Sequence, residues 1–178
     1  MDFLIDRANE ERINNMLFGL MIAIIVVAIT LGAIYKNITL LLITLFLNFI
    51  PIFIVAGIMG FTNLELRGAT SIIFTVGFVI AVDDTIHLLS KFQWELKKGE
   101  YLQNAISNAL HECGKAILAT SFLLIGGFAI LMLSDFMEIF TLGLLVGLIV
   151  LITLSVDFIL APVLLLMCFK KYDKNETN

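Results

Sequence analysis

The chain has 178 residues, of which 60% are hydrophobic and 15% charged; its mean hydropathy is +1.04 and its formal net charge is −4. These values lie far from those of soluble domains, so the composition indicates an integral membrane protein and shows no basic footprint for nucleic acid. At about 20 residues per span, the length suits one helical bundle of five or six spans. Cys113 and Cys168 are too few for a disulfide framework, and we interpret both as packing residues.

The first predicted span is Met16 to Tyr35. It follows an acidic start and lacks a cleavage pattern, so it is not interpreted as a signal peptide, and residues 1–15 are expected to form an extracytoplasmic lead-in. The second span, Ile38 to Phe61, contains Asn48 and Pro51. Proline lacks an N–H and clashes with the preceding turn, so Pro51 is expected to act as a helix hinge.

Three further spans are predicted along the rest of the chain. The third is Gly68 to Ser90 and the fourth is Ala116 to Leu133. Between them, the apolar residues of Tyr101 to Cys113 recur at helical spacing, which predicts a short amphipathic helix on the cytoplasmic membrane surface or, alternatively, a helical loop packed on the bundle. The fifth span, Ile139 to Phe169, is longer than one bilayer requires and is expected to tilt, kink or protrude. Residues 170–178 are expected to be a disordered cytoplasmic tail.

Five spans place the two ends of the chain on opposite sides of the membrane. One predicted side carries the lysines: Lys36, Lys91, Lys97, Lys98, Lys115, Lys170, Lys171 and Lys174. The other side carries Arg7, Arg12 and Arg67. Because lysine and arginine accumulate on the cytoplasmic side of membrane proteins, the C-terminus is predicted to be cytoplasmic and the N-terminus to lie outside.

Four ionisable residues lie inside the predicted spans: Asp83, Asp84, His87 and Asp157. A charged aspartate near the bilayer centre costs roughly 2.5 to 3.5 kcal/mol on insertion scales, so each of these residues requires a partner or a function. His87 follows Asp83 by four residues and Asp84 by three, which is the spacing of one helix face. Asp83 lies about 12 Å along the helix from Lys91, which places the cluster near the middle of the bilayer.

Asp83 and Asp84 are predicted to bind and release protons, with His87 as a relay. Two neighbouring carboxylates in a medium of low dielectric do not both ionise easily, because desolvation and like-charge repulsion favour the protonated form. One alternative is a polar pair that only fixes helix packing. Another is a divalent metal site, but a second acidic cluster would be expected for it, and only Asp157 is available. The sequence therefore favours proton exchange over metal binding.

Asp157 lies five residues before Pro162, whose missing N–H frees the carbonyl of Phe158 and loosens the helix. This combination predicts a hinge at Pro162 beside an accessory polar path, to which Thr120 and Ser121 could contribute. In the alternative, these hydroxyls only satisfy the carboxylate of Asp157. The sequence contains no G-x-S-x-G, H-E-x-x-H, phosphate-loop or C-x-x-C motif, so we expect neither catalysis nor a cofactor.

The order of these features resembles the membrane half-repeat of the resistance-nodulation-division (RND) superfamily, most closely its MMPL-like lipid-exporter branch, and the related five-helix sterol-sensing domain. The resemblance extends from Met16 to Phe169 and rests on four segments: "VAGIMGF", "GFVIAVDDTIHLLSKF", "AISNALHECGKAILATSFLLIGGFAIL" and "VDFILAPVLLL". It implies a five-helix bundle in a bacterial cytoplasmic membrane that exports hydrophobic or amphiphilic molecules at the expense of proton influx. Asp83 and Asp84 match the positions of the family's proton site.

The resemblance also implies partners. Members of this family contain two such halves, each preceded by an extra helix and a large extracytoplasmic domain, so the chain is expected to be the C-terminal membrane half. Its expected partners are the N-terminal half with its porter domain, membrane lipids and a hydrophobic substrate. The alternatives are a lipid-binding regulatory module of the sterol-sensing type and an inactive transporter fragment.

Overall fold

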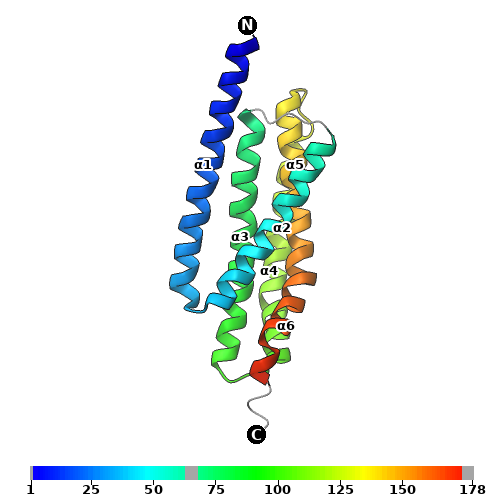
Figure 1. Cartoon of the computed structure of the whole chain (residues 1–178). Coiled ribbons are helices and arrows are strands. Elements are labelled where there is room, and N and C mark those ends of the chain that lie inside the picture. Colours follow the sequence, from blue (N-terminus) through cyan, green and yellow to red (C-terminus); the bar gives the residue numbers. More distant parts are fainter. Residues whose placement is uncertain (1, 63–67, 174–178) are drawn as a thin grey trace.

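The computed structural model describes residues 2–62 and 68–173, and this part of the chain contains helices and no strands. The elements are α1 (Asp2–Tyr35), α2 (Ile38–Phe61), α3 (Gly68–Lys97), α4 (Leu102–Leu131), α5 (Met137–Ser155), a π-helical turn η1 (Val156–Leu160) and α6 (Ala161–Asp173). Because α5, η1 and α6 follow one another without a break, they form one helical rod beside the other four. The rods lie side by side in an elongated bundle (Figure 1), and the predicted all-α class is confirmed.

Four helical stretches are long and apolar enough to cross a membrane: Ile38–Phe61, Ile73–Lys97, Leu102–Leu131 and Met137–Lys170. The first rod adds a shorter apolar stretch, Met21–Tyr35. Large apolar side chains such as Phe53, Phe122 and Ile159 are exposed on the outside of the bundle. An exposed apolar surface of this extent suits lipid and not water, so the chain is a multi-pass membrane protein.

The central helix of the bundle is α3, which packs against α1, α2, α4 and α5. It begins at Gly68, as predicted, but continues past Ser90 to Lys97. Within the extension, Lys91 and Glu95 form an ion pair one turn apart, at 2.9 Å, which supports its helical form. The predicted bounds of the second span are those of α2, which runs through the buried Pro51 as one helix.

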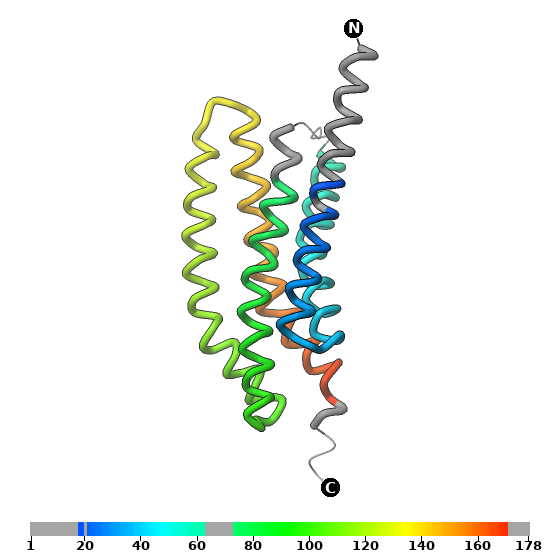
Figure 2. Tube along the Cα trace, turned by 90° about the vertical axis from the view of Figure 1, so that its left-hand side faces the viewer, coloured from blue at the N-terminus to red at the C-terminus, as the bar shows by residue number. Residues whose placement is uncertain are grey.

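The predicted surface helix at 101–113 and the predicted span at 116–133 are one continuous helix, α4, and their separation was wrong. No residue between them breaks the helix, and Gly114 permits a close contact: a Cβ atom there would lie 3.1 Å from the ring of Phe158. The apolar residues of the first turns are buried inside the bundle and not spread on a membrane surface. Figure 2 shows α4 as an outer helix with a bend near its lower end.

The fifth predicted span, Ile139 to Phe169, corresponds to the α5–η1–α6 rod. The loosening expected near Pro162 takes the form of η1, in which the N–H of Ala161 donates to the carbonyl of Val156 five residues earlier. A proline that removes a hydrogen-bond donor is compatible with such a wide turn. The rod therefore remains helical past Pro162. Its π-helical turn contains Asp157.

The predicted cytoplasmic lysines gather at one end of the bundle. Lys36 lies in the α1–α2 connection, Lys97 ends α3 and Lys98 directly follows it, and Lys170 lies near the end of α6, all at the lower end in Figure 1. Trp94 lies at the same end, with the ammonium of Lys98 3.1 Å from the centre of its ring. Tryptophan beside cations is typical of a membrane–water interface.

Gly143 provides the first testable prediction. A Cβ atom at Gly143 would lie 2.6 Å from the carbonyl oxygen of Phe128 in α4, whereas one at Gly147 would meet no atom within 4 Å. Because a backbone oxygen cannot swing away as a side chain can, Gly143→Ala is expected to lower the free energy of unfolding by about 1–3 kcal/mol. Gly147→Ala is the matched control and is expected to be neutral or stabilising. Thermal unfolding in detergent measures both, and equal midpoints would contradict the close α4–α5 contact.

Candidate functional site

The two adjacent aspartates of α3 point in different directions. Neighbouring helical residues are turned by about 100° from one another. The side chain of Asp83 is 74% exposed, whereas Asp84 is buried with 7% exposure. The helical register of α3 thus gives the pair two environments, one on the outer face of the bundle and one turned into it.

A cavity of about 320 Å³ between α3 and α4 joins these two environments. The lining residues are Asp83, Asp84 and His87 from α3 and Glu112, Cys113, Ala116, Ile117 and Thr120 from α4. The predicted cluster of α3 and the predicted hydroxyl of Thr120 therefore share one cavity. Four of its lining side chains carry ionisable groups of the carboxylate or imidazole type, so the cavity is a polar feature within an otherwise apolar bundle.

His87 lies on the outer side of this cavity. Its Nε2 atom is 3.7 Å from Oδ1 of Asp83, and its side chain is 69% exposed. The sequence spacing predicts His87 above both aspartates, and in the structure its ion-pair contact is with Asp83. Asp84 is turned inward and is buried.

A charge cluster lies between the cavity and the lysine-bearing end of the bundle. Lys91 of α3 forms ion pairs with Glu95 of the same helix and with Glu112 of α4. Glu95 is buried, and Lys98 approaches it at 3.8 Å. The spacing of Lys91 and Glu95 was readable in the sequence, but the contact with Glu112 depends on the register of α3 against α4.

A second group of polar side chains lies inside the bundle and includes Thr85, the residue that follows Asp84. The hydroxyl oxygen of Thr85 lies 2.9 Å from Oδ1 of Asp157 and 3.1 Å from Oδ1 of Asn48. Thr85, Asp157 and Asn48 are almost completely buried, with exposures of 0%, 1% and 1%. They come from α3, η1 and α2, so this polar layer joins three elements.

The polar layer lies between two apolar clusters of the core. One cluster contains Phe78 and Val82 of α3, and the other contains Leu88 and Phe92 farther along the same helix. Thr85 lies between these pairs. Apolar packing on both sides shields the layer from solvent, and buried polar groups in such surroundings must satisfy one another.

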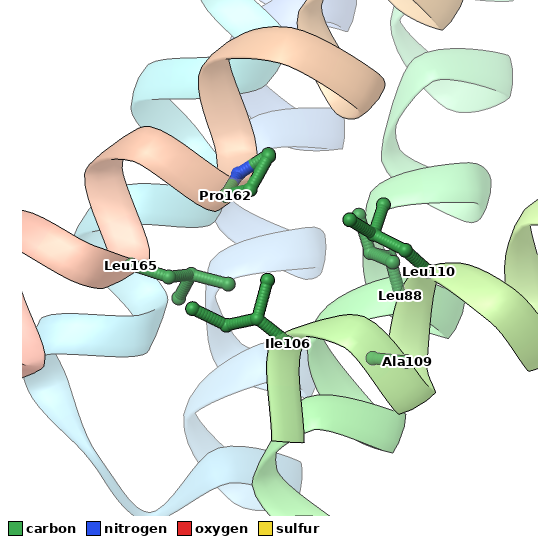
Figure 3. Close-up of a pocket in the computed structure, with 6 residues that line it drawn as sticks. All are labelled: Leu88, Ile106, Ala109, Leu110, Pro162 and Leu165. Carbon is green, nitrogen blue, oxygen red and sulfur yellow. The ribbon is translucent and has the colours of Figure 1, made fainter. Parts of the chain in front are cut away.

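An apolar crevice lies where α3, α4 and α6 meet, and Figure 3 shows the side chains around it. The lining residues are Leu88, Ile106, Ala109, Leu110, Pro162 and Leu165. The crevice is too narrow to admit a water molecule. These side chains therefore pack beside the turn at Pro162 without space for water or a ligand.

The accessory path predicted from Asp157, Thr120 and Ser121 is not one group in the structure. The hydroxyl of Thr120 donates to its own helix, at the carbonyls of Ala116 and Ile117. Ser121 is buried, and its hydroxyl has no hydrogen-bond partner within the described residues. The hydroxyl beside Asp157 belongs to Thr85, which sequence reasoning missed.

Two signals could have pointed to the polar layer. Asn48 is a polar residue in a predicted span, and Thr85 directly follows the aspartate pair. Their meeting with Asp157 depends on how three helices are rotated against one another, which no spacing within one helix reveals. Within the described residues, no group of three or more histidine, cysteine, aspartate or glutamate side chains converges in metal-binding geometry.

The helical membrane bundle is consistent with the comparison to known families. The model of the MMPL family matches residues 6–172, which is nearly the whole chain. The chain belongs to the MMPL family. A protein of Methanocaldococcus jannaschii named "Putative membrane protein MJ1562" is 32% identical over 87 residues, which cover 49% of this chain and 22% of that protein. The matched stretch is thus a small part of that relative.

Membership in the MMPL family gives the bundle a general role as a membrane module related to transport. In this MMPL protein the cavity at Asp83 and Asp84 brings ionisable side chains of two helices together between apolar outer surfaces.

Proposed function

We propose that this MMPL protein is the membrane half of a proton-driven exporter of lipids or other hydrophobic molecules, with Asp83 and Asp84 as the proton site and His87 as a relay. The supporting observation is the shared cavity, in which an exposed and a buried carboxylate lie side by side. Protonation removes the charge of a carboxylate and with it the cost of holding that charge in a low-dielectric medium.

The arrangement suggests an order of proton transfer. Asp83 and His87 lie on the outer side of the cavity and can receive a proton from water. Asp84 lies deeper, directly before Thr85, whose hydroxyl contacts the interior layer. A change of charge at Asp84 therefore occurs beside the place where α2, α3 and η1 meet, and helix packing can respond to it.

The exposed face of the site, which carries Asp83 and His87, supports the proposal of a partner within the membrane. Asp83 and His87 expose most of their side chains within a helical stretch that is long and apolar enough to cross a membrane, where contact with hydrocarbon would be costly. We propose that another membrane unit of the transporter, the N-terminal half with its porter domain, covers this face. The remaining exposed surface is apolar and suits lipid, and the transported molecule is proposed to be hydrophobic or amphiphilic.

The proposed location is a cytoplasmic membrane, with the C-terminus inside and the N-terminus outside. The support is the gathering of Lys36, Lys97, Lys98 and Lys170 at the end of the bundle where α6 ends. Positive residues flanking spans remain on the cytoplasmic side during insertion. The cavity with Glu112 then lies on the route from the aspartate pair toward the cytoplasm.

Reconstitution tests the proposed function. The protein, alone and together with the N-terminal half, is placed in liposomes that contain a pH-sensitive dye, and an inward proton gradient is imposed. Proton entry is expected for the wild type and is expected to fall to the level of protein-free liposomes for the double variant Asp83→Asn, Asp84→Asn. Full proton entry in the double variant would contradict the proton site. Lipid binding without any proton entry by the wild type would favour the regulatory module of the sterol-sensing type.

A further inference from the structure

The hydroxyl of Thr85 faces more hydrogen-bond acceptors than it can satisfy. The carbonyl oxygen of Ala81, Oδ1 of Asn48 and Oδ1 of Asp157 lie 3.0, 3.1 and 2.9 Å from its oxygen. A threonine hydroxyl has one hydrogen. Asn48 cannot supply a second one, because its Nδ2 donates to the carbonyl of Thr44 at 2.7 Å and its amide oxygen therefore faces Thr85. The Ala81 carbonyl also accepts a backbone N–H within its own helix, so two acceptors, Oδ1 of Asn48 and Oδ1 of Asp157, remain for the one hydroxyl hydrogen, and one hydrogen is missing from this group.

Asp157 is the residue that can supply the missing hydrogen. Its exposure is 1%, and its second carboxyl oxygen, Oδ2, has no hydrogen-bond partner within the described residues. An ionised carboxylate in such a place would be a buried charge held by one hydroxyl, which is strongly unfavourable. A protonated carboxyl has no such charge and can donate to the oxygen of Thr85.

The groups around Asp157 are uncharged or acidic. Asn48 from α2 is neutral, and Asp84 of α3 is the ionisable neighbour whose charge acts on Asp157. On the rod that carries Asp157, the nearest described ionisable side chain toward the C-terminus is Cys168, eleven residues away, and toward the N-terminus it is Glu138. A negative charge on Asp84 opposes a second negative charge on Asp157, so these surroundings favour the neutral acid.

We propose that Asp157 is a second proton-binding site, separate from the Asp83–Asp84 cavity and occupied in this conformation. The protonated carboxyl donates to Thr85, and the hydroxyl of Thr85 donates to Oδ1 of Asn48. The resulting chain of hydrogen bonds joins η1, α3 and α2. Release of the proton breaks the chain at the turn with the wide π-helical backbone, where the packing of α6 is free to change. This inference does not depend on transport.

Infrared difference spectroscopy of the purified protein tests the proposal, because a protonated carboxyl has a C=O band separate from the carboxylate bands. At neutral pH a component of this band is expected in the wild type, retained in Asp84→Asn and in the exposed control Asp135→Asn, and lost in Asp157→Asn. Absence of the band from the wild type would overturn the proposal. So would a band that disappears in Asp84→Asn and persists in Asp157→Asn.

A second variant keeps the proposal testable if Asp157→Asn does not fold. Thr85→Val removes the acceptor of the carboxyl hydrogen and leaves Asp157 in place. The C=O band is then expected to persist and to move to higher frequency, because a carboxyl without a hydrogen-bond acceptor has a stiffer C=O bond. A band at an unchanged frequency in Thr85→Val would show that the proton is not on Asp157.

Discussion

Asp84→Asn is expected to reduce proton entry into proteoliposomes to the level of protein-free liposomes, whereas Asp83→Asn is expected to leave measurable entry. Asp84 is the buried member of the pair and lies next to Thr85, so a proton there can influence the packing of three elements. Asp83 lies on the exposed side with His87, and the imidazole of His87, which lines the same cavity as Asp84, can still pass protons to it when Asp83 is replaced. An asparagine has the shape of the protonated acid but carries no acidic proton that it can release.

The control for this experiment is Asp135→Asn. Asp135 is an exposed carboxylate in the connection between α4 and α5, and it does not line the cavity. Its replacement removes the same charge and is expected to leave proton entry unchanged. If Asp83→Asn abolished proton entry and Asp84→Asn did not, the buried and exposed carboxylates would have the reverse of their proposed roles.

Thr85→Val is expected to destabilise the bundle by about 3 kcal/mol. The replacement preserves the volume of the side chain, but it leaves Oδ1 of Asn48 and the carboxyl of Asp157 without their shared partner. Each buried polar group left without a hydrogen bond costs about 1–3 kcal/mol. Thermal or denaturant unfolding in detergent, followed by circular dichroism, measures the difference from the wild type.

Thr141→Val is the matched control for the loss of a buried threonine hydroxyl. Thr141 is also buried, with 6% exposure, but its hydroxyl donates only to the carbonyl of Met137 in its own helix. That carbonyl belongs to an α-helix turn, so little is lost when the hydroxyl is removed. Equal destabilisation by Thr141→Val and Thr85→Val would show that the hydrogen bonds between α2, α3 and η1 do not contribute to stability.

The helices themselves were predictable to different degrees. The second span had the bounds of α2 because its apolar run is closed by polar residues at both ends. The ends of α3 and α4 were misjudged where polar residues remain helical, as at Lys91 and Glu95, because a span defined by hydropathy stops at the first charges while the helix does not. Hydropathy reports the hydrocarbon boundary, and hydrogen bonds and ion pairs decide where a helix ends.

The sequence by itself determined that this is a helical membrane protein with ionisable residues near the middle of its third span. Composition, the length of apolar runs and the spacing of Asp83, Asp84 and His87 within one helix are local properties, so they can be read along the chain. Only the tertiary structure decided that Asp84 is buried while Asp83 is exposed, and that Asp157 meets Thr85 and not Thr120 or Ser121. These facts depend on the rotation and register of one helix against another, which are set by packing between residues distant in sequence.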